Sequence, residues 1–206
     1  GGAAALAGVI VLGAREGRFS KSGETKSLVP FAASSIPLVT LGTFLLWFGW
    51  FGFNGFSQLA MGTFDDVNAI SKIAVNTHLA GAAGTVAAAV VTRLLGGKTD
   101  IVMMLNGALA GLVAITAEPL TPSPVLAIVI GAIGSLIMYF GTKFLESKKI
   151  DDVVGAIPVH MFAGIFGTLV VPISNPDTNF GTQLTGVIAV CLFSFILSYI
   201  TFRVLK

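Results

Sequence analysis

The chain has 206 residues, of which 54% are hydrophobic and only 11% are charged, and its mean hydropathy is +0.91. Soluble globular chains carry about 25% charged residues, so a water-soluble core of this size would lack the polar surface needed to cover it. The net charge of +2 comes from basic residues spread along the chain, which excludes a nucleic-acid-binding patch. We therefore expect a membrane protein whose main solvent is the lipid bilayer.

Apolar runs follow one another along the whole chain. A helix needs roughly 20 mostly apolar residues to cross a bilayer, and by that measure the chain opens in a partial span and continues with six complete ones. The partial span covers residues 1–13, and the complete spans cover residues 30–53, 68–94, 101–117, 124–145, 153–171 and 182–203. The short connections are rich in turn residues. This pattern predicts an all-α membrane protein, a polytopic helix bundle, and the opening within an apolar run indicates a fragment of a longer chain.

Basic residues alternate between successive connections. The first, third, fifth and last connections or ends carry Arg15, Arg18, Lys21, Lys26, Arg93, Lys98, Lys143, Lys148, Lys149, Arg203 and Lys206. The intervening ones carry Asp65, Asp66, Glu118 and Asp177, and only Lys72 departs from the pattern. The positive-inside rule places the basic connections in the cytoplasm, so the C-terminal end is expected to face the cytoplasm.

Small residues recur four positions apart within the spans. The pairs are Ala80 and Gly84, Gly107 and Gly111, Gly131 and Ser135, and Ala163 and Gly167. Such pairs allow helix backbones to approach closely in lipid. They predict a tightly packed bundle and indicate nothing about a cargo.

His160 is the most informative polar residue of the spans. An ionisable side chain within a span is costly and usually faces the protein interior or a pathway. Ala156 and Gly164 lie one turn to either side, on the same face, and Pro158 deprives the carbonyl of Val154 of its helical partner. Two interpretations remain: a histidine in the wall of a narrow apolar slot, or a packing histidine bonded to a neighbouring helix.

An aromatic run lies at the outer end of the first complete span. It reads Trp47-Phe48-Gly49-Trp50-Phe51-Gly52-Phe53-Asn54-Gly55-Phe56-Ser57. An interfacial aromatic belt explains Trp47 but not the density of the run. Phe53 and Ser57 are four residues apart and share a face if the helix continues. A ring and a hydroxyl at a pore mouth can attract a small cation.

Other polar residues favour structural roles. His78 follows Asn76 and Thr77, and this trio can hydrogen-bond across a helix interface. Asp152 stands two turns before His160, where a carboxylate suits a helix N-terminus, so we expect a structural capping role. The single cysteine, Cys191, excludes a disulfide framework within the chain. Nucleotide-binding, zinc and nucleophile motifs are absent from the sequence, so we predict no enzyme activity, no metal site and no cofactor.

The ordered motifs resemble those of the Amt/Mep/Rh family of ammonium transporters. They are the aromatic stretch 49–54, Asn76-Thr77, the small-residue run 106–113, and Asp151-Asp152 followed by Val159-His160. Residues 4–13 also resemble the end of that family's fifth span, so the resemblance covers essentially the whole chain. Departures are the bulky Phe56 in the aromatic motif and His78, which is not a usual family histidine.

The resemblance implies an eleven-span fold of two inverted five-helix repeats and a long last helix. Residues 1–13 would end span five, residues 30–171 would form the second inverted repeat and residues 182–203 the last span. It also implies a homotrimer in the plasma membrane, most often the bacterial or archaeal cytoplasmic membrane. The implied substrate is ammonium or ammonia, and a PII-type regulatory protein is a possible partner of the family.

The resemblance also assigns residue roles. His160 corresponds to the second of two pore histidines, Phe53 to one of two stacked phenylalanines at the outer mouth, and Ser57 to the outer hydroxyl that recruits ammonium. Trp50 belongs to the same motif, and Thr116 aligns with a threonine that lines the pathway. Two alternatives to a transporter stay open: an ammonium sensor coupled to a cytoplasmic signalling domain, and an Rh-type gas channel.

Overall fold

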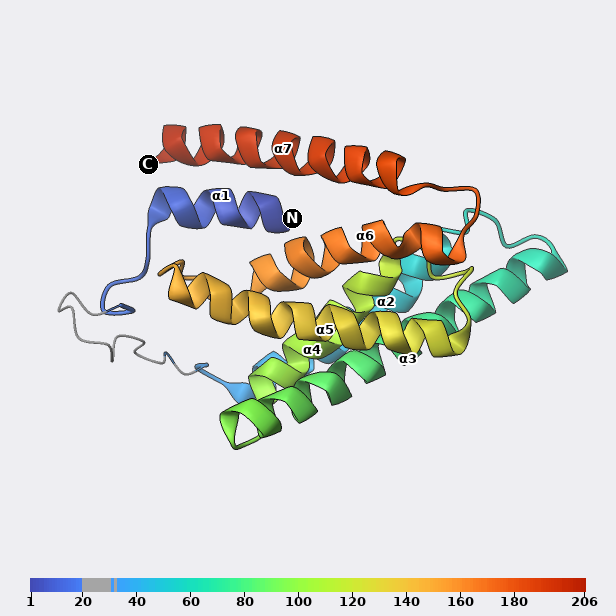
Figure 1. The fold of residues 1–206 in the computed structure, drawn as a ribbon, viewed down its shortest axis with the longest axis horizontal. Helices are drawn as coiled ribbons and strands as arrows, with labels where there is room; N and C mark the ends of the chain where they lie inside the picture. Colours follow the sequence, from blue (N-terminus) through green and yellow to red (C-terminus); the bar gives the residue numbers. More distant parts are fainter. Residues whose placement is uncertain (20–30, 32) are drawn as a thin grey trace.

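Helices make up all the regular elements of the computed structural model, which describes residues 1–19, 31 and 33–206 (Figure 1). In chain order they are α1 (Gly2–Leu12), α2 (Ile36–Phe56), α3 (Phe64–Gly96), α4 (Ile101–Thr116), α5 (Pro124–Ser147), the π-helical η1 (Ile157–Phe162), α6 (Ala163–Ser174) and α7 (Phe180–Leu205). Among the described residues, five helical stretches are long and apolar enough to cross a membrane, with η1 and α6 counted as one. The predicted polytopic helix bundle is thus confirmed.

Each predicted span coincides with a helix, and the differences concern length. Helix α4 has 16 residues, which at about 1.5 Å per residue is about 24 Å, short of the roughly 30 Å of a hydrocarbon core. Helix α2 begins at Ile36 rather than at residue 30, because the Ser35 hydroxyl accepts a hydrogen bond from the Leu38 N–H and Pro37 occupies the first turn. Residues 30 and 32, and the predicted connection 20–27 with Lys21 and Lys26, lie outside the described residues.

Helix α3 begins four residues before the predicted span. A capping box starts it: the Thr63 hydroxyl accepts from the Asp66 N–H, and the Asp66 carboxylate accepts from the Thr63 N–H at 3.1 Å. The hydropathy pattern missed this first turn because Asp65 and Asp66 make it polar. Capping chemistry, and not hydrophobicity, sets this boundary.

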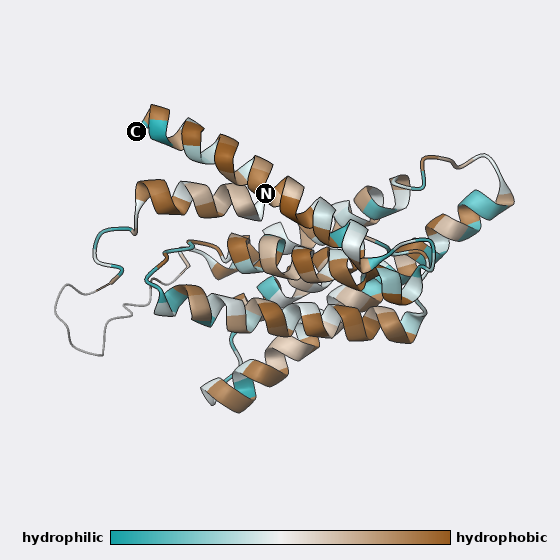
Figure 2. Ribbon diagram, turned by 45° about the horizontal axis from the view of Figure 1, so that its top comes forward, coloured by the Kyte–Doolittle hydropathy of each residue, from teal (hydrophilic) through white to brown (hydrophobic). Residues whose placement is uncertain are grey.

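The helices form two groups that lie side by side. Helices α1 and α7 run parallel along one edge of the molecule in Figure 1, and α3, α4 and α5 pack together below α6. The Lys206 ammonium group donates to the carbonyl of Val11 at 2.6 Å, which joins the C-terminal ends of α7 and α1. Figure 2 shows that hydrophobic residues fill the middle of the helices, whereas hydrophilic residues gather at their ends and in the connections.

Backbone-to-backbone contacts hold α3, α4 and α5 together. A Cβ atom added to Gly131 or to Gly111 would overlap the carbonyl oxygen of Ala80, and one added to Gly84 would overlap that of Gly107. We call these five residues the small-residue seam. The Ser135 hydroxyl adds a 2.7 Å hydrogen bond to the Gly84 carbonyl across it. The close helix approach predicted from the small-residue pairs is confirmed in these three helices.

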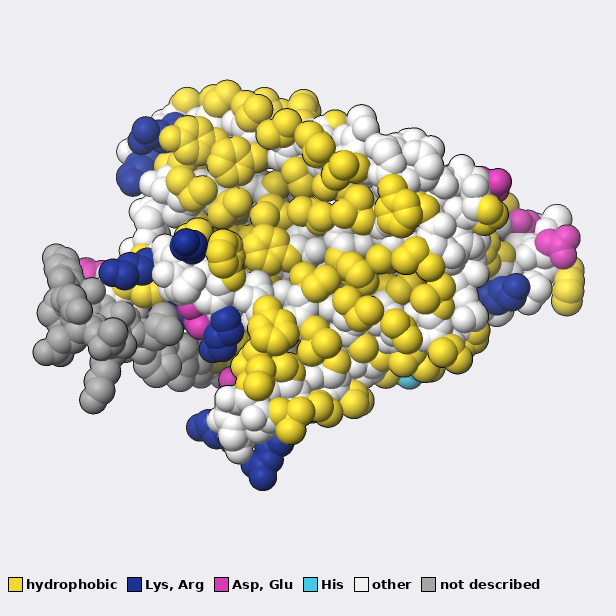
Figure 3. All heavy atoms as spheres, viewed as in Figure 1, with side chains coloured by type: hydrophobic (Ala, Val, Ile, Leu, Met, Phe, Trp, Pro, Cys, Tyr) yellow, Lys and Arg dark blue, Asp and Glu magenta, His cyan; other side chains and the backbone are white. Residues whose placement is uncertain are grey.

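Charged side chains gather at the two ends of the bundle. On the face shown in Figure 3, most Lys and Arg side chains lie at the end that carries the C-terminus, and the opposite end shows mainly acidic side chains. Apolar side chains cover the surface between these ends. This distribution is the one that a membrane-spanning bundle requires.

Candidate functional site

A cavity of about 620 Å³ opens on one side of the bundle, between α2, α4 and the η1–α6 helix. Its wall consists of Gly1, Leu45, Leu46, Gly49, Trp50, Phe53, Val113, Thr116, Ala117, His160, Gly164 and Thr168. Most of these residues are apolar or are glycines, and the polar side-chain groups are an imidazole, an indole N–H and two hydroxyls. Four of the five predicted pathway residues, His160, Phe53, Trp50 and Thr116, therefore meet at one cavity.

His160 reaches the cavity from the π-helical turn η1. Its neighbours Val159 and Ala163 are buried in a cluster with Ala110 of α4 and Met138 of α5. His160 and Gly164 lie on the adjoining face of the helix, which lines the cavity. The His160 side chain is exposed to the cavity.

The helix that carries His160 begins at Ile157 with Pro158 in its first turn, where a missing N–H costs no helical hydrogen bond. Val154 lies in the bend before this helix, and its carbonyl accepts a hydrogen bond from the side-chain amide of Asn106 on α4 at 3.1 Å. Gly155 has φ +76°, in the left-handed region that favours glycine. π-Helical turns are rare and often occur at functional sites. The sequence prediction that Pro158 frees a helical carbonyl at Val154 is therefore wrong, because the helix begins three residues after Val154.

Asp152 holds the start of this helix. Its carboxylate accepts hydrogen bonds from the N–H groups of Gly155 and Ala156, both at 3.0 Å, and of Ile157 at 2.6 Å. One carboxylate therefore satisfies the N–H groups of three consecutive residues where the helix begins. The negative charge also faces the positive end of the helix dipole.

Trp50, Phe53 and Thr116 form a connected group in the cavity wall. The indole Nε1–H of Trp50 on α2 donates to the hydroxyl oxygen of Thr116 on α4 at 2.7 Å. The rings of Trp50 and Phe53 meet edge to face, with centroids 6.1 Å apart and planes inclined by 69°. Sequence spacing places Trp50 and Phe53 on one face of α2, but no local pattern indicates that Thr116 is the partner of Trp50.

Ser57 lies outside this cavity, in a neighbouring open hollow of about 560 Å³. Phe53 lines both spaces, and Gly49, Gly52, Phe56 and Leu59 complete the hollow. Ser57 caps the end of α2, and its hydroxyl donates to the carbonyl of Phe53 at 2.8 Å. With its proton engaged there, the oxygen keeps lone pairs that can accept a hydrogen bond from a cation.

The polar trio 76–78 divides its roles. The Asn76 amide donates to the carbonyls of Pro119 and Pro122, and Thr77 accepts from the Asn54 amide at 3.0 Å. His78 instead packs against the rings of Trp47 and Phe51, with centroids 5.5 and 6.2 Å away. Hydrogen bonding across a helix interface is thus confirmed for Thr77, whereas Asn76 bonds to the α4–α5 connection. His78 is an exposed packing residue away from the cavity wall.

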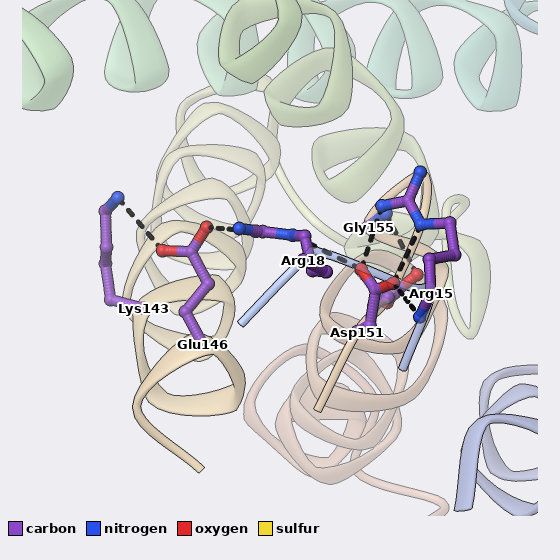
Figure 4. A network of polar contacts seen from close by, with 7 residues as sticks. Arg15, Arg18, Lys143, Glu146, Asp151 and Gly155 are labelled. Atoms are coloured by element: carbon purple, nitrogen blue, oxygen red, sulfur yellow. Dashed lines mark hydrogen bonds and ion pairs between the residues drawn. The ribbon is translucent and has the colours of Figure 1, made fainter. Parts of the chain in front are cut away.

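A charged network lies at the basic end of the bundle, close to the start of the His160 helix (Figure 4). Two nitrogens of the Arg15 guanidinium donate to the Asp151 carboxylate at 2.7 and 2.8 Å, and the Arg15 backbone N–H donates at 3.0 Å. Arg18 contacts both Asp151 and Glu146, which also accepts from Lys143. The side-chain hydrogen bonds from Arg15 lower the pKa of buried Asp151 to about 2, against the raising effect of burial, and they raise the pKa of Arg15.

This network joins the chain after α1 to the connection between α5 and η1. The sequence pattern singled out Asp151-Asp152 as a motif but gave a role to Asp152 alone. Asp151 and Arg15 are 136 residues apart, a separation at which no periodicity carries information. Among residues 1–19, 31 and 33–206, no three His, Cys, Asp or Glu side chains come together as a metal site.

Comparisons with known proteins agree with the family resemblance of the sequence motifs. A family model described as the Ammonium Transporter Family matches residues 1–206. Ammonium transporter Amt2 of Archaeoglobus fulgidus is 43% identical over 185 residues, which are 90% of this chain and 38% of that protein.

Two solved structures share the fold. A protein named "Sensor Amt Protein" matches this chain with a TM-score of 0.88 and 35% sequence identity. The match covers 100% of this chain and 52% of that protein's chain. Rh50 of Nitrosomonas europaea, from a study of conduction by the Rhesus protein family of channels, has a TM-score of 0.77 and 28% identity, covering 99% and 52%. The chain therefore spans about half or less of the length of these relatives, and it belongs to the ammonium transporter family.

Proposed function

We propose that this chain supplies one wall of a transmembrane pathway for ammonium or ammonia. The observation that carries the proposal is the convergence of His160, Trp50 and Phe53 on one apolar cavity in a bundle of membrane-spanning helices. In this assignment residues 1–13 end span five, residues 30–171 form the second repeat and residues 182–203 form the last span. Inverted repeats with the pathway between them recur among transporters.

The proposed passage begins at the hollow beside Ser57. An ammonium ion is recruited there by the free lone pairs of the Ser57 oxygen and by the face of the Phe53 ring. The cavity beyond Phe53 is largely apolar, and moving a bare ammonium-sized ion into such a medium costs about 20 kcal/mol in the idealised limit. The cation therefore gives up a proton or pairs with a polar group before it passes.

His160 is the group in the wall that can exchange a proton or hydrogen bond with the substrate. A neutral imidazole has one accepting and one donating nitrogen, so it can accept from an ammonium N–H or donate to the ammonia lone pair. Whether net charge crosses depends on the path of the released proton. The remaining wall residues shape the slot and exclude water.

The test replaces His160 with Ala in the protein expressed from its complete reading frame. Reconstituted in liposomes, His160→Ala is expected to abolish uptake of isotopically labelled ammonium or to change the charge carried per molecule. His78→Ala is the matched control, because His78 lies away from the cavity wall and should leave both quantities unchanged. Uptake and current that are both unaltered in His160→Ala would refute the proposed role.

The solved relatives favour two alternative functions. The protein named a sensor shares this fold at a TM-score of 0.88, which favours an ammonium sensor that signals through a cytoplasmic domain. The coding sequence that follows Lys206 tests this candidate, since a sensor requires a signalling module there or on a docked partner. The Rh50 match favours a channel for neutral gas, and uptake without any accompanying current would support that reading.

We propose further that the protein forms a homotrimer in the plasma membrane, the cytoplasmic membrane of a prokaryote, with its C-terminal end in the cytoplasm and with a PII-type protein as a regulatory partner. The gathering of Lys and Arg side chains at the C-terminal end of the bundle supports the orientation (Figure 3). A reporter fused after Lys206 that is active only in the cytoplasm tests it. Native mass spectrometry of the purified protein tests the trimer.

A further inference from the structure

Thr116 uses its hydroxyl group within the protein. The hydroxyl proton is donated to the carbonyl of Leu112 at 2.6 Å, and one lone pair accepts the Trp50 indole N–H at 2.7 Å. A hydroxyl has one proton to donate and two lone pairs to accept with. Thr116 therefore has no proton left for a neutral ammonia molecule, whose main hydrogen-bonding group is its own lone pair.

Trp50 is likewise committed. An indole has a single donor and no acceptor, and that donor points to Thr116. The ring can then offer only its face and edges, and one of these contacts is the edge-to-face packing on Phe53. The hydrogen bond to α4 thus fixes the rotation of the Trp50 ring, and the ring packs against the phenylalanine that borders both the cavity and the outer hollow.

We infer that Thr116 is a positioning residue: it orients Trp50 and, through Trp50, the Phe53 ring that borders both the hollow and the cavity. This inference rests on the proposed function, because it assigns the rings a task in passage. It differs from a role for Thr116 as a hydrogen-bonding ligand of the substrate. It predicts that loss of the hydroxyl relaxes the discrimination by size at Phe53.

Three variants of the protein expressed from its complete reading frame separate the two roles. Thr116→Val removes the hydroxyl at nearly constant volume, Thr116→Ser keeps it, and Trp50→Phe keeps a ring without the N–H. Thr185→Val is the matched control, since the Thr185 hydroxyl bonds to the Gly181 carbonyl on the exposed face of α7. Uptake of ammonium and of the larger methylammonium is compared in liposomes.

Thr116→Val is expected to raise the methylammonium-to-ammonium uptake ratio roughly fivefold, the change that the loss of one aromatic edge contact corresponds to. Thr116→Ser and Thr185→Val should leave the ratio unchanged. The double variant Thr116→Val with Trp50→Phe should show no further change beyond the larger single effect, because both substitutions break the same hydrogen bond. Equal losses of both substrates, or effects that add, would overturn the inference in favour of direct contact with the substrate.

A second readout does not depend on transport. In protein labelled with 5-fluorotryptophan, the fluorine resonance that disappears in Trp50→Phe belongs to Trp50. That resonance should shift in Thr116→Val and keep its position in Thr116→Ser and Thr185→Val, and an unshifted resonance in Thr116→Val would refute the positioning role. If the unaltered protein carries no ammonium, the proposed function fails, and the fluorine shift alone decides whether Thr116 orients Trp50.

Discussion

Replacing Asp152 with Ala should destabilise the protein by releasing the first turn of the His160 helix. The substitution removes three hydrogen bonds, from the N–H groups of Gly155, Ala156 and Ile157. A single neutral cap contributes about 0.5–2 kcal/mol, charge-assisted bonds are stronger, and the helix dipole adds about 0.3–1 kcal/mol. Water replaces part of this at a half-buried site, so the expected loss is about 2–3 kcal/mol.

That loss should be visible as a lower melting temperature of the detergent-solubilised protein. A domain of this length shifts by about 2–4 °C per kcal/mol, so Asp152→Ala should melt about 4–12 °C below the unaltered protein. Asp152→Asn keeps one accepting oxygen and should fall between the two. Asp177→Ala, at an exposed acidic residue of the α6–α7 connection, is the control.

Transport should follow the same order, since the helix that Asp152 caps carries the imidazole. We expect ammonium uptake to decline from the unaltered protein through Asp152→Asn to Asp152→Ala. A melting temperature of Asp152→Ala equal to that of Asp177→Ala would show that the three hydrogen bonds contribute nothing net. The reasoning from capping to the position of His160 would then be wrong.

Two further predictions concern stability. The folded-state pKa of Asp151 is about 2, below its ordinary 3.8, so its pairing with Arg15 stabilises the protein above pH 3.8 and this contribution is lost as the pH falls towards 2. Asp151→Asn should therefore lower the melting temperature at neutral pH, and the difference from the unaltered protein should shrink in acid. A difference in melting temperature that does not depend on pH would contradict the assignment. Gly131→Ala places a Cβ atom against the Ala80 carbonyl and should lower the free energy of unfolding by about 1–3 kcal/mol. Its melting temperature should therefore be lower than that of Gly186→Ala, whose added Cβ meets open space. Equal melting temperatures of the two variants would show that the helices separate without cost.

Hydropathy and charge were sufficient to predict the bundle, because both follow from local composition. A span is a run of about 20 apolar residues whatever it packs against. Helix ends were predicted less well, since the hydroxyl of Ser35 and the capping box at Thr63 decide them. Pro158 was expected to interrupt a helix that already included Val154, but the helix begins after Val154, and the hydrogen bond from Asn106 to the Val154 carbonyl had no signal in the sequence.

Of the candidate site, too, the sequence predicted what lies on one helix but not the contacts between helices. Spacing on one helix predicted that Phe53 and Ser57 share a face of α2, and the family resemblance supplied Trp50 and Thr116. The bond from Trp50 to Thr116 joins residues 66 apart, and the pairing of Arg15 with Asp151 joins residues 136 apart. Such contacts depend on how helices cross, which a single sequence does not encode in any local pattern. The π-helical turn at His160 also had no signal beyond Pro158.

The small-residue seam has a mechanical consequence. Where a glycine meets a carbonyl oxygen directly, as Gly131 and Gly111 meet Ala80, no side chains are present that could change rotamer and let the helices slide. Shear between packed helices needs such adjustable layers. We therefore expect α3, α4 and α5 to stay a single stiff block throughout a working cycle, so that any opening and closing is left to the rings of α2 and to the π-helical turn, which border that block.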